Sequence, residues 1–169
     1  MKSLLLLPLV TLSIAASAGN VELNFIDSNG ITGKAGNVQY EDTPYGLLLT
    51  PQLSGLPPGV HGFHVHDRAS CDPALVDGKM VAGAGAGGHW DPEKTGLHLG
   101  PYNSKGHKGD LPALYADANG TVTQPVLAPR LKATDLAGHS LMVHLGADNH
   151  SDHPAMLGGG GARLACGVL

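Results

Sequence analysis

Residues 59–66 read Gly-Val-His-Gly-Phe-His-Val-His, a stretch that combines the pattern of a β-strand with a concentration of histidine. Apolar side chains alternate with histidines from Val60 to Val65, and a period of two is typical of a half-buried strand. Successive side chains of a strand point to opposite faces. The stretch therefore predicts a strand with His64 and His66 on one face and Val65 on the other.

Short segments of the same kind occur along most of the chain, and helical periodicity is nearly absent. The other alternating or apolar segments are residues 21–25, 47–49, 114–116, 140–144 and 163–169. Turn sequences such as Ser28-Asn29-Gly30 separate them. Short strands with turns at this spacing favour an antiparallel sandwich or barrel.

Two long stretches, residues 67–110 and 145–162, do not have the pattern of strands. Segments of this length without regular structure are usually functional or disordered in a compact domain. The first contains many of the histidines, and the second contains the glycine run 158–161. We therefore expect an all-β chain with two long functional loops.

The first 18 residues have the pattern of a secretory signal. Lys2 precedes the apolar residues 4–14, and Ala16-Ser17-Ala18 is a small-residue cleavage site. A membrane anchor is the alternative, but a spanning helix needs about 20 apolar residues. A lipid anchor would need a cysteine just after the signal. We expect a signal peptide at residues 1–18, one domain at residues 19–169 and export to the periplasm, with no membrane association after cleavage.

Composition limits the classes of partner. The formal net charge is −4, and removal of Lys2 with the signal would make it −5. No basic patch with interleaved aromatic residues is present, so we expect no nucleic-acid partner. The cysteines, Cys71 and Cys166, predict one disulfide in an exported protein, with two free buried thiols as the alternative.

Ten histidines in 169 residues indicate a metal site. One loop segment supplies a plausible tetrahedral zinc set of three imidazoles and one carboxylate, from His89, His98, His107 and Asp110. The alternative is a polar loop with scattered histidines. His144 follows an apolar segment and could complete a second site with His64 and His66. Imidazole ligation suits copper, but composition does not choose copper over zinc.

These motifs resemble those of the copper/zinc superoxide dismutases. The resemblance covers essentially the whole expected mature chain and rests on residues 59–66, 86–89, 107–111, 141–144 and 160–168. Further segments resemble the bacterial periplasmic branch of the family. These are residues 87–92, 109–114, 127–130 and 148–154.

The resemblance implies an eight-stranded antiparallel Greek-key barrel with two metals. The implied copper ligands are His64, His66, His89 and His144. The implied zinc ligands are His89, His98, His107 and Asp110. The implied reaction is conversion of superoxide to dioxygen and hydrogen peroxide by alternating reduction and reoxidation of copper, with a structural zinc bridged through His89.

The resemblance also implies roles around the metals. Arg163 would hold the superoxide anion beside copper, and His89 would relay a proton. Asp148 would hold one copper ligand and one zinc ligand, and His61 would support the copper strand. The disulfide between Cys71 and Cys166 would anchor the metal loop beside Arg163.

Several alternatives stay open at this point. A periplasmic metal buffer or chaperone would explain the ligands but not Arg163, and a copper-only enzyme would not need the zinc set. A haem site, known in some relatives, has no support in these residues. Leu99, Pro101 and Tyr102 could form a homodimer contact or a self-packed loop. We expect His139, His150 and His153 at the surface without a role, with a weak extra metal site at His150 and His153 as the alternative. Four lysines in or near the metal loop could assist steering, but we expect them to be ordinary surface residues: Lys79, Lys94, Lys105 and Lys108.

Overall fold

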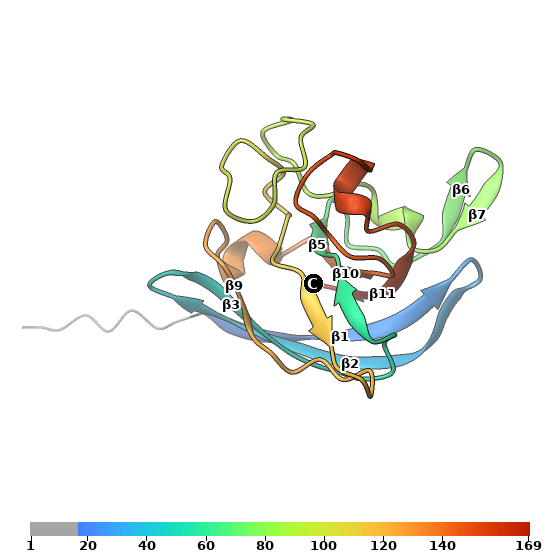
Figure 1. The fold of residues 1–169 in the computed structure, drawn as a ribbon, viewed down its shortest axis with the longest axis horizontal. Helices are drawn as coiled ribbons and strands as arrows, with labels where there is room; N and C mark the ends of the chain where they lie inside the picture. The colour runs from blue at the N-terminus through green and yellow to red at the C-terminus, as the bar shows by residue number, and fades with distance from the viewer. Residues whose placement is uncertain (1–16) are drawn as a thin grey trace, which may run out of the picture.

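A computed structural model of the chain describes residues 17–169 (Figure 1). The signal expected at residues 1–18 lies almost entirely outside the described residues. Within residues 17–169 no helix is long and apolar enough to cross a membrane. Three short 3₁₀ helices are present there, η1 (Ala84–Ala86), η2 (Ala133–Leu136) and η3 (Met156–Gly159).

Strands dominate the described residues, as expected. They are β1 (Ala18–Asp27), β2 (Gly30–Thr43), β3 (Gly46–Leu53), β4 (Gly59–His61), β5 (Phe63–His66), β6 (Ala74–Val76), β7 (Lys79–Val81), β8 (Leu114–Ala116), β9 (Val126–Ala128), β10 (Ser140–His144) and β11 (Arg163–Val168).

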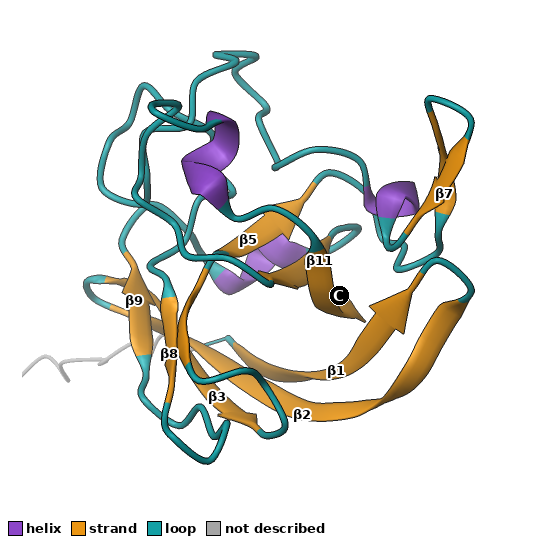
Figure 2. Cartoon of the chain, turned by 45° about the vertical axis from the view of Figure 1, so that its right-hand side comes forward, coloured by secondary structure: helices purple, strands orange, loops and turns teal. Residues whose placement is uncertain are grey.

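The main sheet is antiparallel and curls strongly (Figure 2). Its seven strands follow the order β5-β10-β11-β1-β2-β3-β9, and β4 pairs separately with β8. Only Gly62 separates β4 from β5, so these two segments form one interrupted strand that links β8 to the sheet. With the outlying β6–β7 hairpin left aside, the strands are those of an eight-stranded Greek-key barrel, and the fold prediction is confirmed.

The alternation in residues 59–66 decides which side chains enter the core. Phe63 and Val65 are fully buried in the main apolar cluster, together with Leu141 and Val143 of the neighbouring strand β10. Successive side chains of a strand alternate between faces, so the histidines of β5 point to the outer face. The two long loops cover that face in both views (Figures 1 and 2).

The first long loop contains one strand pair that we did not expect. β6 and β7 form a hairpin around Asp77 and Gly78, which both have positive φ, 50° and 78°. Asp-Gly between apolar residues is a strong hairpin signal, and it was present in the sequence. The hairpin projects from the barrel (Figure 1), and Leu75 is 71% exposed, so burial does not stabilise it.

Candidate metal centre

Main-chain pairing brings four histidines together on the outer face of the barrel. His64 and His66 lie on β5 and His144 on β10, in a register that pairs Met142 with His64 and Ser140 with His66. The other edge of β5 pairs with loop residues, because a bridge joins His66 to His89 and another joins His64 to Asp110. The close approach of the loop to β5 requires a glycine at position 109, since a Cβ there would overlap the main chain of Val65 and Trp90.

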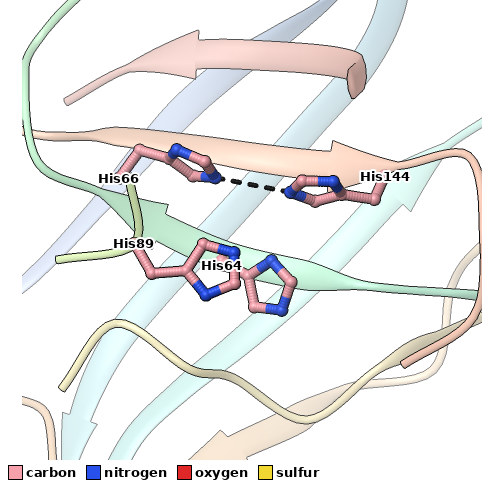
Figure 3. A group of neighbouring side chains, drawn as sticks. All are labelled: His64, His66, His89 and His144. Atoms are coloured by element: carbon pink, nitrogen blue, oxygen red, sulfur yellow. Dashed lines mark hydrogen bonds between the residues drawn. The ribbon is translucent and has the colours of Figure 1, made fainter. Parts of the chain in front are cut away.

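Nitrogen atoms from these four histidines converge on one point. One nitrogen each from His64, His66, His89 and His144 lies within 4.8 Å of the others. Figure 3 shows His66 and His144 facing each other from neighbouring strands, with their Nε2 atoms 3.4 Å apart. His64 Nδ1 and His89 Nε2 are buried without a hydrogen-bond partner. Buried polar atoms normally have partners, so this group fits a metal ion.

Acceptors fix the opposite ring nitrogens of the same group. His66 Nδ1 donates to the Gly87 carbonyl at 3.0 Å, and His144 Nδ1 donates to the Gly161 carbonyl at 3.2 Å. His64 Nε2 donates to Asp148 Oδ2 at 2.8 Å. Such contacts set the tautomer and orientation of metal-binding imidazoles.

A second group surrounds the Asp110 carboxylate. Asp110 Oδ1 lies 2.9 Å from His89 Nδ1, 3.1 Å from His98 Nδ1 and 3.4 Å from His107 Nδ1. A tetrahedral zinc site with bonds of about 2.0–2.1 Å has ligand atoms about 3.3 Å apart. The Nδ1 atoms of His98 and His107 are buried without hydrogen bonds. The donor set therefore fits zinc.

His64 competes with His107 for a place in this second group. The ligand atoms that lie within 4.8 Å of one another around Asp110 come from His64, His89 and His98. His64 Nε2 is already bonded to Asp148, however, and its free Nδ1 is needed by the first group. The free Nδ1 of His107 has no such alternative, so His107 fits the second group better.

Two residues join the groups. His89 contributes its Nε2 to the first group and its Nδ1 to the second, as a bridging ligand requires. The Asp148 carboxylate accepts from His64 Nε2 through Oδ2 and from His98 Nε2 through Oδ1, each at 2.8 Å. Gly158 allows this contact because a Cβ there would overlap Asp148 and His98.

The protonation of the two groups differs. Burial lowers the pKa of His64, His66 and His89, and it lowers the pKa of His144 to about 4. These imidazoles are therefore neutral at neutral pH, the form that binds metals.

The second group binds a proton in the absence of metal. Burial opposes a charged His98, but hydrogen bonds to Asp110 and Asp148 outweigh burial and raise the pKa of His98 to about 9. Burial also opposes ionisation of Asp110 and Asp148, but hydrogen bonds with neighbouring imidazoles hold the pKa of each carboxyl well below its usual range.

Arg163 lies beside the first group. It opens β11 opposite His144, and its guanidinium donates to the carbonyls of Gly83 and Gly87. Arg163 is close enough to help lower the pKa of His66 and His144. The disulfide between Cys71 and Cys166 joins the loop that carries these carbonyls to β11.

The remaining histidines lie around the groups rather than in them. His61 Nδ1 faces the main-chain carbonyl of His144 at 2.8 Å. His139 Nδ1 lies within hydrogen-bond distance of the main-chain carbonyls of His66 and Asp67. His150 lies beside Asp148, with 3.8 Å between His150 Nδ1 and Asp148 Oδ1, and His153 is exposed.

Of the three residues considered for either a homodimer contact or a self-packed loop, two are at least partly buried. Pro101 is buried and Leu99 is half-buried, which leaves Tyr102 as the exposed member of the three, at 72%. Lys108 pairs with Asp135 at 2.9 Å and lies over the Trp90 ring. Sequence reasoning missed Asp152, whose Oδ2 accepts from the His98 main-chain N–H at 2.9 Å.

Fold and site together define a class of protein: an antiparallel β-barrel whose outer face carries two adjacent groups of side chains that fit metal ions and share one histidine. Comparison with known proteins identifies the family. The family model for copper/zinc superoxide dismutase matches residues 31–169. The chain therefore belongs to the copper/zinc superoxide dismutase family.

Bacterial relatives are similar over most of their length. The chain is 57% identical to superoxide dismutase [Cu-Zn] 1 of Salmonella typhimurium, over 94% of this chain and 92% of that one. Among solved structures, the Cu/Zn superoxide dismutase from Brucella abortus is 47% identical, with a TM-score of 0.88, over 90% of this chain and 99% of that one. The monomeric enzyme from Salmonella enterica is 49% identical, with a TM-score of 0.80, over the same shares.

Proposed function

We propose that this chain is a periplasmic superoxide dismutase with a copper ion at the first group and a zinc ion at the second. The copper ligands are His64, His66, His89 and His144. The zinc ligands are His89, His98, His107 and Asp110. The observation that carries this proposal is the shared His89, whose two ring nitrogens face the two groups.

Copper, when bound, supplies the one-electron chemistry by which two superoxide anions and two protons become dioxygen and hydrogen peroxide. Zinc has no redox chemistry, and its ligands order the loop beside the copper group. The protein supplies orientation, charge and a proton. Three acceptors hold the copper-binding imidazoles in place, on Gly87, Gly161 and Asp148.

Arg163 binds the substrate. Its guanidinium is a permanent cation with forked donors, which suits a small anion. The net charge of −4 repels superoxide overall, so a local positive field is needed to attract it. Contacts with Gly83 and Gly87 keep this cation beside His66 and His144.

His89 handles the proton. Its Nδ1 stays with the zinc group beside Asp110, and its Nε2 faces the copper group. Nε2 is therefore the atom that takes up a proton and returns it to the reduced product. Its position between two metal groups makes loss of a ring proton feasible, because metals reverse ordinary pKa relations.

The periplasmic location rests on the sequence at residues 1–18 and on the bacterial relatives. Cleavage after Ala18 would leave nearly all of β1, which begins at Ala18. Mass spectrometry of the protein recovered from a periplasmic extract tests this. The mass of a chain that starts at Gly19 would support the proposal, and an unprocessed chain in the cytoplasm would contradict it.

A homodimer stays a prediction centred on Tyr102. Its 72% exposure leaves the ring free for a contact, and the solved relative from Salmonella enterica is described as monomeric. Sedimentation of Tyr102→Glu beside the parent decides the question, since an unchanged mass removes Tyr102 from any interface.

The decisive experiment is superoxide dismutation by residues 19–169, reconstituted with copper and zinc, beside His144→Ala and His153→Ala. We expect turnover that depends on copper, collapses in His144→Ala and persists in His153→Ala, whose imidazole is exposed. One copper and one zinc per chain without turnover would contradict the proposal and would favour a metal buffer.

A further inference from the structure

Arg130 belongs to a segment, residues 127–130, that resembled the bacterial branch but received no role from the sequence. It lies directly after β9 on a firmly held part of the barrel. Ala128 pairs with Leu47 of β3, and Leu131 is buried in the core. Gly46 permits this packing, because a Cβ there would overlap Ala128 and Pro129.

The Arg130 guanidinium contacts four carbonyl oxygens of the metal loop. Nε donates to Pro101 O at 2.8 Å, and Nη1 donates to Gly106 O at 3.3 Å. Nη2 donates to Gly100 O at 3.1 Å and to His107 O at 2.6 Å. One side chain therefore holds both ends of the loop segment 100–107.

This segment has few other main-chain connections to the barrel. The loop main chain is bonded to Val65 of β5 at Trp90 and Gly109, on either side of the segment. Among the described residues, no main-chain hydrogen bond joins residues 99–106 to a strand. Arg130 provides the connection that the main chain does not.

The contacts of Arg130 lead directly to two proposed zinc ligands. The carbonyl of His107 is one of its acceptors. The carbonyl of Gly100 is another, and the Gly100 N–H donates to Asp110 Oδ2 at 3.3 Å. His107 Nδ1 and Asp110 Oδ1 lie 3.4 Å apart, so a shift of either end of the segment would change the ligand geometry.

We propose that Arg130 is a positioning residue for zinc: it fastens the segment 100–107 to the rigid edge of the barrel and so holds His107 and Asp110 at ligand spacing. The inference rests on the proposed zinc ligands. A guanidinium can do this because its planar fork offers five donors in fixed directions. A lysine at the same position would keep the charge but lack the fork.

The test begins with zinc and copper affinities of the metal-free protein, measured one metal at a time by chelator competition. Loss of a contact that orients a metal ligand typically weakens affinity about 10–100-fold. We expect this loss for zinc in Arg130→Ala and Arg130→Lys, with copper affinity changed by less than about threefold. Lys132→Ala, which removes an exposed cation two residues further along the chain, is the control and should match the parent.

Chemical rescue separates the fork from the charge. Methylguanidinium added to Arg130→Ala should recover part of the zinc affinity, and methylammonium should not. Amide hydrogen exchange provides a readout without metal, in which residues 99–106 of metal-free Arg130→Ala should exchange faster than in the parent. Unchanged exchange together with unchanged zinc affinity would overturn the proposal.

Other outcomes overturn it as well. Equal losses of zinc and copper would mean general destabilisation, and tighter zinc binding in Arg130→Ala would mean that the guanidinium acts only through its positive charge. His107→Ala separates this inference from the proposed function. If His107→Ala retains full zinc affinity, the ligand assignment fails; if it loses zinc while Arg130→Ala does not, only the role of Arg130 fails.

Discussion

Replacing Asp148 with alanine removes the carboxylate that joins the two metal groups. His64 Nε2 and His98 Nε2 each lose an acceptor at 2.8 Å, but their main chains are held differently. His64 lies on β5, where β10 on one edge and the loop on the other fix it. His98 lies in the loop, where its main-chain N–H donates to Asp152 Oδ2. We therefore expect zinc binding to suffer more than copper binding.

The magnitude follows from the contact that is lost. A hydrogen bond to a charged group contributes about 1.5–3 kcal/mol, which corresponds to a factor of about 10–100 in affinity. We expect the dissociation constant of zinc to rise by this factor. The copper constant should rise by less than about tenfold, because the strands keep His64 in place after the acceptor is gone.

Chelator competition on the metal-free Asp148→Ala protein, one metal at a time, measures both constants. Glu22→Gln is the matched control, since it removes a carboxylate from the exposed pair with Lys34, at 2.6 Å. Equal weakening of both metals would refute the reasoning, because it would show that β5 does not hold His64 independently. Unchanged constants would refute the role of Asp148 itself.

Two further predictions concern protons and the disulfide. Because His98 in the metal-free protein has a pKa of about 9, zinc must displace its proton below that pH, so zinc affinity should rise about tenfold per pH unit between pH 6.5 and 9. Copper affinity should vary less over this pH range, since the pKa of His144 is about 4. Calorimetry in buffers of different ionisation enthalpy measures the protons that are released when zinc binds. A zinc affinity that does not depend on pH would contradict the role of the His98 proton. Replacing Cys71 and Cys166 with serine opens a link across 95 residues, which in the chain-entropy model costs about 4–5 kcal/mol of stability. Turnover per copper should also fall, because the carbonyls that hold Arg163 lie in the loop that the disulfide anchors, and unchanged turnover would leave the bond a purely structural role.

The strand parts of the candidate site could be predicted from the sequence, because side-chain direction on a strand follows from position alone. His64 and His66 share a face, as the alternation predicted, and the pairing of β10 with β5 brings His144 beside them. The β6–β7 hairpin was missed although its Asp-Gly turn was visible, since the surrounding segment was interpreted as one loop.

The loop parts could not be worked out in the same way. No periodicity relates His89, His98, His107 and Asp110. Their residue types within one loop made a zinc set plausible but left a polar loop open as the alternative, and the assignment came from the family resemblance. Their positions depend on long-range contacts, such as the bridge between His66 and His89 and the bond from His98 Nε2 to Asp148. The role of Arg130 was equally hidden, because its acceptors are main-chain carbonyls that any sequence would supply.

This contrast has a physical consequence for the two metal groups. Three of the four proposed copper ligands lie on paired strands, and the fourth, His89, is bonded to the edge of β5. Two of the proposed zinc ligands, His98 and His107, lie between those edge contacts and are held by side chains, through Asp152, Asp148 and Arg130. Because paired strands open less readily than loops, we expect the barrel to organise the proposed copper group before metal binds, whereas the proposed zinc group should depend on its metal and on these side chains. Since the two ring nitrogens of His89 face both groups, zinc bound at the proposed ligands would fix the orientation of the same imidazole for which the proton role is proposed.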